Sequence, residues 1–200
     1  LVVGSILISL LVSYYVYDLS GLYKLNWLAE EKEESKIVNI NAGFDETSIL
    51  LRDKFKNADF VVLDFYDPLK HTEISIKRAR KAYPPFPNTK NVTTSNLPLA
   101  DKSIDNVFVL FSAHEIRNES ERVNFFKELN RVLKSTGKIF ITEHLRDTAN
   151  FLAYNIGFFH FYSKSSWCRI FKTAHFTIQK EIKCTPFITT FILKPDGDSF

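Results

Sequence analysis

The chain has 200 residues, of which 45% are hydrophobic and 24% are charged, a composition typical of one globular domain and not of a disordered chain. Its formal net charge of +3 is too small to indicate a nucleic-acid-binding surface, so we expect no nucleic-acid partner. The two cysteines, Cys168 and Cys184, lack zinc-site spacing, and we expect free thiols in a reducing, cytoplasmic compartment.

The N-terminal segment is apolar. The run from Leu1 to Tyr17 carries no charged residue and ends in a cluster of tyrosines, which are common where a helix leaves a membrane. Two interpretations are open: a membrane anchor that holds the domain on the cytoplasmic side, or a helix that packs on the domain. Because the chain contains no methionine, even at position 1, we expect the natural chain to begin before Leu1.

A charged linker, residues 30–36, separates this N-terminal helical segment (1–30) from the remaining domain (36–194). Beyond the linker, apolar runs of strand length alternate with helical patterns. The predicted strands are 37–40, 60–63, 92–94, 104–111, 138–142, 176–183 and 187–193, and the first predicted helices are 49–55 and 72–83. A further helix is expected after Asn118, which can cap it, with Gly137 at its C-terminal end.

This alternation predicts a parallel sheet covered by helices on both faces, because the strands are almost wholly apolar. The last two strands are joined through Thr185 and Pro186, a connection too short for a parallel pair. We therefore expect an α/β fold: a doubly wound, mostly parallel, seven-stranded sheet with an antiparallel C-terminal strand pair, plus an N-terminal apolar helix.

Ligands of doubly wound sheets bind beyond the carboxyl ends of the strands. The first such loop contains a single glycine, Gly43, and is followed by Asp45 and Glu46 at the start of the next helix. These carboxylates would repel a diphosphate but not a cationic ligand, which argues against NAD. Asp64 ends the second strand about 20 residues further on, where a carboxylate can accept ribose hydroxyls. Ordinary turns and helix caps are the alternatives at both places.

Four ordered segments carry a resemblance to a known family. They are Val-Asn-Ile-Asn-Ala-Gly (38–43), Val-Leu-Asp (62–64), Leu-Pro-Leu-Ala-Asp-Lys-Ser-Ile-Asp-Asn-Val (97–107) and Leu-Lys-Ser-Thr-Gly-Lys-Ile-Phe-Ile (133–141). In this order they resemble the class I S-adenosylmethionine-dependent methyltransferases with a type 11 or type 25 domain. The resemblance implies a Rossmann-like domain over about residues 36–194, S-adenosyl-L-methionine as the cofactor and a small-molecule methyl acceptor.

The resemblance also implies a set of cofactor-binding residues. This set is Asn39, Asn41, Ala42, Gly43, Asp64, Phe65, Thr93, Thr94 and Ser112. Residues 41–43 would lie under the methionine part of the cofactor, Asp64 would bind the ribose and Phe65 would lie beside the adenine. Thr93 or Thr94 replaces the usual acid near the adenine amine. Because two glycines of the family's loop are also replaced, a non-catalytic binding protein is the alternative function.

His114, Glu143 and His144 are the candidate catalytic residues. They follow the fourth and fifth predicted strands, and a histidine near a carboxylate suits proton transfer near neutral pH. The alternative is a structural role in which the carboxylates pair with Arg117 or Arg146. No single stretch has metal-ligand spacing, so we predict no metal site.

Two further segments bear on the acceptor. Residues 150–171 are dense in aromatic side chains, which predicts either an apolar acceptor pocket or aromatic packing of the domain. The basic helix at 72–83 predicts a solvated face, or a contact with anionic lipid if the N-terminal segment lies in a membrane. The sequence thus predicts a methyltransferase with a small, apolar acceptor and a possible tether to the cytoplasmic side of a membrane.

Overall fold

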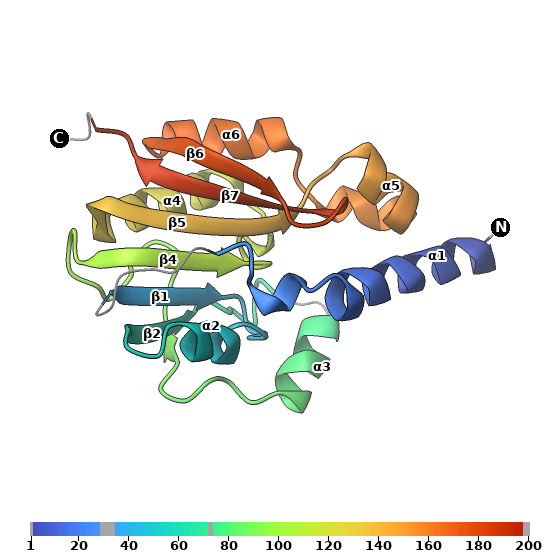
Figure 1. Cartoon of the computed structure of the whole chain (residues 1–200), viewed down its shortest axis with the longest axis horizontal. Helices are drawn as coiled ribbons and strands as arrows, with labels where there is room; N and C mark the ends of the chain where they lie inside the picture. The colour runs from blue at the N-terminus through green and yellow to red at the C-terminus, as the bar shows by residue number, and fades with distance from the viewer. Residues whose placement is uncertain (1, 29–34, 72–73, 198–200) are drawn as a thin grey trace.

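The computed structural model describes residues 2–28, 35–71 and 74–197. Its centre is one seven-stranded sheet in the order β3-β2-β1-β4-β5-β7-β6 (Figure 1). The strands are β1 (Lys36–Asn41), β2 (Asp59–Asp64), β3 (Lys90–Asn91), β4 (Ile104–Leu110), β5 (Leu133–His144), β6 (Phe176–Lys183) and β7 (Ile188–Pro195). Strands β1 to β5 run parallel, whereas β7 is antiparallel to β5 and β6. This confirms the predicted fold and its antiparallel C-terminal pair.

Helices lie on both faces of the sheet. They are α1 (Val2–Tyr14), α2 (Ser48–Lys54), α3 (Ile74–Ala82), α4 (Glu119–Val132), α5 (Thr148–Tyr154) and α6 (Lys164–Thr173), with short helical turns η1 (Tyr15–Leu19), η2 (Leu22–Lys24), η3 (Ala113–Glu115) and η4 (Asn155–His160). Successive residues of a strand face opposite layers. Val107 accordingly packs in the cluster under α4 and α6, and Phe108 in the cluster under α2.

The strand order reverses between β1 and β4, which lie side by side in the sheet. In a doubly wound sheet this reversal opens a crevice at the carboxyl ends of the strands, since the connections leave in opposite directions. The arrowheads of β1 and β4 point toward the end of the molecule at which α1, α3 and α5 lie (Figure 1). The ligand edge of the sheet is therefore the edge that the N-terminal segment approaches.

One predicted helix end is wrong. Asn118 does cap α4, accepting a hydrogen bond from the backbone N–H of Glu121, but the helix ends at Val132 and Gly137 lies inside β5. A Cβ at Gly137 would lie 2.9 Å from the carbonyl oxygen of Asp105. The glycine is thus needed for the close approach of β4 and β5, which the sequence pattern does not distinguish from a helix end.

The third strand is displaced from its predicted position. β3 covers Lys90–Asn91, and Thr93 forms an isolated bridge with Asn96 instead. This edge strand pairs only with the last two residues of β2, so its position depends on β2 and not on an apolar run of its own.

The N-terminal segment divides into an exposed and a buried part. α1 projects from the domain, whereas Val16 of η1 is fully buried and Leu25 and Leu28 join the core under α2. This confirms the predicted N-terminal helix. Part of the predicted charged linker, residues 29–34, and the first two residues of the predicted basic helix, 72 and 73, lie outside the described residues.

Candidate functional site

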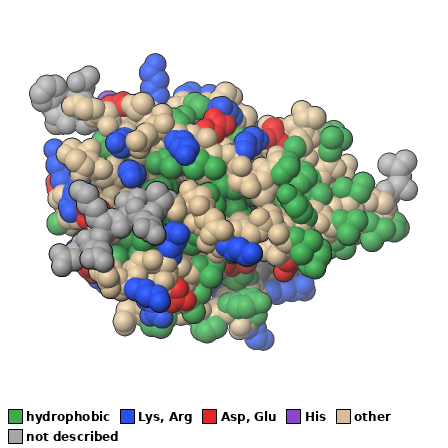
Figure 2. Space-filling view, viewed as in Figure 1, with side chains coloured by type: hydrophobic (Ala, Val, Ile, Leu, Met, Phe, Trp, Pro, Cys, Tyr) green, Lys and Arg blue, Asp and Glu red, His purple; other side chains and the backbone are tan. Residues whose placement is uncertain are grey.

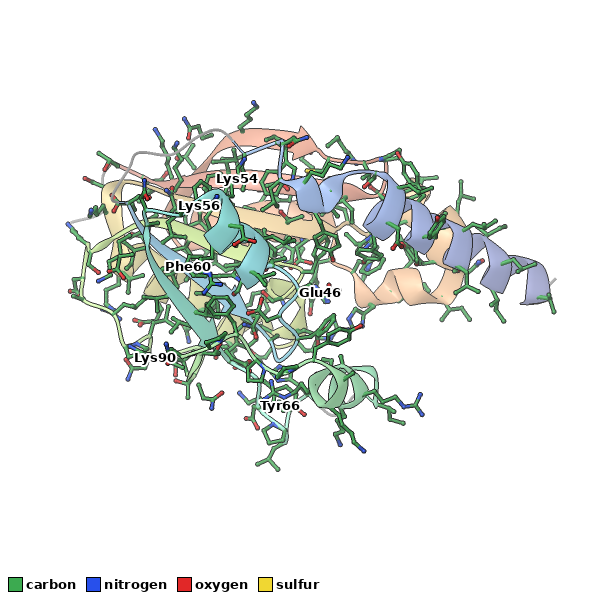
Figure 3. The ribbon with its side chains drawn as sticks, turned by 60° about the horizontal axis from the view of Figure 1, so that its bottom comes forward. Glu46, Lys54, Lys56, Phe60, Tyr66 and Lys90 are labelled. Carbon is green, nitrogen blue, oxygen red and sulfur yellow. The ribbon has the colours of Figure 1, made fainter. Side chains whose placement is uncertain are left out.

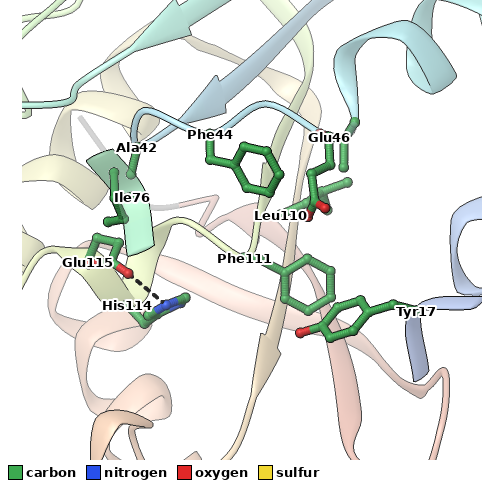
Figure 4. A pocket seen from close by; sticks show the side chains of 10 residues that line it. Tyr17, Ala42, Phe44, Glu46, Ile76, Leu110, Phe111, His114 and Glu115 are labelled. Carbon is green, nitrogen blue, oxygen red and sulfur yellow. Dashed lines mark ion pairs between the residues drawn. The ribbon is translucent and has the colours of Figure 1, made fainter. Parts of the chain in front are cut away.

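A cavity of about 360 Å³ opens at the carboxyl ends of β1 and β4 (Figure 4). Its lining residues come from five separate segments of the chain: Tyr17, Ala42, Phe44, Glu46, Thr47, Ile76, Leu110, Phe111, His114 and Glu115. The walls are mostly apolar and the carboxylates of Glu46 and Glu115 lie at opposite sides. Such a cavity suits a small organic ligand with a positively charged group.

The loop after β1 forms one wall of this cavity. Gly43 has a φ of +97°, a conformation that favours glycine. The side chain of Asn41 accepts a hydrogen bond from the Gly43 N–H, and Asp45 Oδ1 accepts from the N–H groups of Thr47 and Ser48. Asp45 thus binds backbone N–H groups where α2 begins, although the N-cap residue itself is Thr47.

Three buried polar atoms of this region have no hydrogen-bond partner among the described residues. They are Asn39 Oδ1, Asn41 Nδ2 and Asp45 Oδ2. Buried polar atoms are almost always paired, and an unpaired one lowers stability by roughly 1–3 kcal/mol. Their concentration at one loop indicates a site prepared for a polar ligand. Together they offer an N–H donor and a carboxylate acceptor, which match a carboxylate and an ammonium group.

Asp64 is held by a cation from α3. It is only 2% exposed, and its Oδ2 lies 2.7 Å from Arg80 Nη1. The same Arg80 nitrogen donates to the carbonyl oxygen of Gly43 at 3.0 Å. The Arg80 guanidinium also lies 4.2 Å from the ring centre of Tyr66, which Figure 3 shows beside α3. Tyr66 and Arg80 therefore cover Gly43. Arg80 also pairs with the carboxylate of Asp64, which was predicted to bind a ribose.

The remaining predicted cofactor residues lie outside the lining of the cavity, apart from Ala42. Phe65 is buried in the main core, 5.6 Å from Phe125. Thr94 donates to Glu121, and Ser112 donates to the carbonyl oxygen of Ile40. Thr93 is exposed.

His114 lies between two carboxylates. Its Nδ1 is 2.7 Å from Glu143 Oε2, and its Nε2 is 3.1 Å from Glu115 Oε1. Burial alone would lower the pKa of His114, but the two carboxylates outweigh burial and raise the pKa to about 10. Burial raises the pKa of Glu115, whereas hydrogen bonds from His114 and His160 outweigh it and hold that pKa well below its usual range. His114 is consequently an imidazolium at neutral pH.

The side chains of His114, Glu115 and His160 approach one another closely enough to hold a metal ion, with ligand atoms within 4.8 Å. However, Arg117 Nη2 lies 2.6 Å from His160 Nδ1. Since an arginine can only donate, His160 Nδ1 accepts, and its Nε2 carries a proton toward Glu115. These contacts describe an ion-pair network, and the expectation of no metal site stays a prediction.

His144 faces the N-terminal segment and does not line the cavity. Asn150 Nδ2 donates to two oxygens, so its Oδ1 accepts from His144 Nδ1 at 3.0 Å. Burial lowers the pKa of His144 to about 4, and the neutral ring accepts from the Tyr17 hydroxyl at 2.9 Å through Nε2. The two predicted catalytic histidines thus differ in protonation at neutral pH: His114 is charged and His144 is neutral.

Sequence reasoning missed three residues that shape the site: Tyr17, Tyr66 and Arg80. Tyr17 belongs to the apolar N-terminal run, and Arg80 was one cation among several on a basic helix. The tyrosine two residues after the carboxylate at the end of β2 was the only local signal. The contacts of all three residues join segments far apart in the chain.

The comparisons with known proteins agree with this geometry. Residues 38–141, more than half of the chain, match the family model described as a methyltransferase domain of type 11. No curated protein is similar enough in sequence to match. Similar solved structures include a SAM-dependent methyltransferase from Aquifex aeolicus (16% identity, TM-score 0.59, covering 89% of this chain and 94% of that one) and one from Methanosarcina mazei (17%, 0.56, 83% and 94%).

A protein from Pyrococcus horikoshii is similar at 18% identity, with a TM-score of 0.63 over 92% of this chain and 90% of that one. At these identities the structural likenesses show the fold, and the family rests on the sequence model. The chain therefore belongs to the class I methyltransferases of the type 11 domain family, whose cofactor is S-adenosyl-L-methionine.

Proposed function

We propose that this protein transfers a methyl group from S-adenosyl-L-methionine to a small, apolar acceptor. The observation that carries the proposal is the set of unpaired buried atoms on Asn39, Asn41 and Asp45 beside the cavity. They fit the amino-acid end of the cofactor: Asn41 Nδ2 can donate to its carboxylate, and Asp45 Oδ2 can accept from its ammonium group. The acidic Glu46 suits the positively charged sulfonium.

The cofactor, when bound, supplies an electrophilic methyl group, so the protein's part is to bind and orient. In our proposal Asp64 holds the ribose hydroxyls once Arg80 has left it. His114, held between Glu143 and Glu115, places its positive charge at the cavity wall, where it attracts an electron-rich oxygen of the acceptor. Phe44, Leu110 and Phe111 exclude water from the acceptor's apolar part.

Calorimetric titration with S-adenosyl-L-methionine and S-adenosylhomocysteine tests the proposal. We expect both to bind, and Asp64→Ala to weaken binding by about tenfold or more, because a carboxylate that accepts two hydroxyls is lost. Asp59→Ala is the matched control, since Asp59 begins the same strand and is exposed. Binding of neither ligand would contradict the proposal, and equal binding by the Asp64 variant would contradict the role of Asp64.

We also propose that α1 tethers the protein to the cytoplasmic side of a membrane. The stretch Val3–Lys24 is the one described helical segment that is long and apolar enough to cross a membrane, and only 6% of its most apolar window is buried. Flotation of the protein with phosphatidylcholine–phosphatidylglycerol vesicles tests this tether. A protein that stays at the bottom of the gradient would contradict it.

A further inference from the structure

A second apolar surface lies beside α1. It is formed by α5 and η4, whose exposed apolar side chains are Phe151 (48% exposed), Leu152 (66%), Ile156 (84%) and Phe159 (63%). The rings are held in place by one another, with Phe158 5.4 Å from Phe151 and 5.3 Å from Phe159. Single exposed apolar residues are ordinary, but a contiguous set marks a contact surface.

The α5–η4 surface is fixed at a known level along α1. Ser9 Oγ in α1 donates to the carbonyl oxygen of Ala153 in α5 at 2.7 Å. On both sides of Ser9, the apolar side chains of α1 remain exposed, with Ile8 at 48% and Leu10 at 61%. Whatever apolar medium surrounds α1 therefore extends to the level of α5, and the exposed side chains of α5 and η4 face the same medium.

Three observations favour a lipid bilayer over a protein partner as that medium. α1 has 13 residues and is about 20 Å long, so it can enter most of a hydrocarbon core of roughly 30 Å. Tyr14 and Tyr15 follow its exposed stretch, and the guanidinium of Arg146 lies 5.9 Å from the ring of Phe159. Aromatic rings next to polar groups are typical of the membrane–water interface.

The charge at this end of the molecule complements anionic lipid headgroups. α3 lies at the same end as α1 and α5 (Figure 1), and it exposes Lys77, Arg78 and Lys81. Each such cation near an anionic membrane surface adds about 1 kcal/mol of attraction. Figure 2 shows hydrophobic side chains gathered over the projecting end that α1 forms, with basic side chains on the surface next to it.

We propose that α1 and the α5–η4 surface dock together on a lipid bilayer, which presses the ligand edge of the sheet against the membrane. The proposal goes beyond a tether, because a tether alone leaves the domain free to turn. Two elements fixed to one another by the Ser9–Ala153 contact allow one orientation, in which the carboxyl ends of β1 and β4 face the lipid. Tyr83, whose ring is 5.5 Å from the cavity residue Phe44, then lies at the headgroup level.

The test places an environment-sensitive fluorophore on single cysteines in the full chain, after Cys168→Ala and Cys184→Ala. Labels are attached through Leu152→Cys, Ile156→Cys and Tyr83→Cys, and the matched control is Ile49→Cys, a similarly exposed apolar residue on α2 (55%). In vesicles of phosphatidylcholine and phosphatidylglycerol that contain nitroxide-labelled lipids, we expect blue-shifted emission and severalfold stronger quenching at 152 and 156 than at 49. The label at 83 should be quenched to an intermediate degree by headgroup nitroxides.

Two results would overturn the proposal. If the protein floats with the vesicles but labels at 152 and 156 are quenched no more than the label at 49, α1 is a simple tether. If these labels are shielded without lipid quenching and transfer energy between chains, the surface contacts a second copy. Neither result depends on cofactor binding, so the proposed methyltransferase function is tested separately.

Discussion

At the scale of single residues, the loop after β1 and the carboxylate of Asp64 are covered by the protein's own side chains. Arg80 neutralises Asp64 and hydrogen-bonds to the carbonyl oxygen of Gly43, and the ring of Tyr66 would lie 2.6 Å from a Cβ at Gly43. A ligand that uses Asp64 must first displace Arg80. The energy of that displacement is subtracted from the binding free energy of the ligand.

Arg80→Ala tests this cover. We expect the variant to bind S-adenosylhomocysteine about tenfold more tightly, because the ligand no longer competes with the guanidinium for Asp64. We also expect the ligand-free variant to melt at a lower temperature, since it leaves a buried carboxylate unpaired. Lys81→Ala, the loss of an exposed neighbouring cation, should change neither quantity. Weaker binding by Arg80→Ala would mean that Arg80 contacts the ligand and does not exclude it.

At the scale of elements, the close approach of β4 and β5 limits which residues can replace Gly137. β5 begins directly after α4, and it pairs with β4 from Leu133 onward with a register shift near Asp105. Gly137 lies at this irregular part of the pair. A Cβ there would meet the Leu133 side chain at 2.8 Å and the Asp105 carbonyl oxygen at 2.9 Å, and the latter belongs to the backbone and cannot move freely.

Gly137→Ala is therefore expected to lower the free energy of unfolding by about 1–3 kcal/mol, the usual effect of overpacking a tight contact. Gly157→Ala is the matched control, because its Cβ would meet only Tyr154 Cβ at an ordinary 3.6 Å. Urea unfolding followed by circular dichroism measures both variants. Equal stability of Gly137→Ala and the wild type would show that β4 and β5 can separate at little cost.

At the scale of the whole molecule, the protonation of His114 links stability to pH. Its pKa of about 10 in the folded protein lies well above the value of about 6.5 for an unfolded histidine. The folded state therefore holds a proton that the unfolded state has released between these two pH values. The stabilisation is complete below about pH 6.5 and is lost as the pH rises toward 10.

We expect the free energy of unfolding of the wild type to fall more steeply between pH 7 and pH 10 than that of His114→Gln. The difference in slope should be at most about 1.4 kcal/mol per pH unit. Near pH 6, where an unfolded histidine is itself largely protonated, the two slopes should converge, which serves as an internal control. Equal slopes over the whole range would mean that His114 is neutral in the folded protein.

The fold could be predicted from the sequence because its signals are local. The apolar run 104–111 predicts a buried strand, and the short connection between 176–183 and 187–193 predicts an antiparallel pair. Asn118 is a local signal for the start of a helix. The helix end predicted at Gly137 was wrong, because a glycine between a helical run and a strand is typical both of a helix end and of a close approach between two strands. Of the predicted site residues, Ala42 and His114 line the cavity, and the roles predicted for the whole set stay predictions. The charge states of these side chains could not be predicted, because they depend on neighbours distant in the chain.

The sequence by itself determined the fold class and the family, because the alternation of strands and helices and the spacing of the motifs are properties of chain order. Only the tertiary structure decided that His114 is charged and His144 neutral, since two carboxylates flank His114, whereas burial lowers the pKa of His144. It also decided that Arg80 covers Asp64. Charge state and accessibility depend on neighbours brought together across the chain, and no local pattern encodes them.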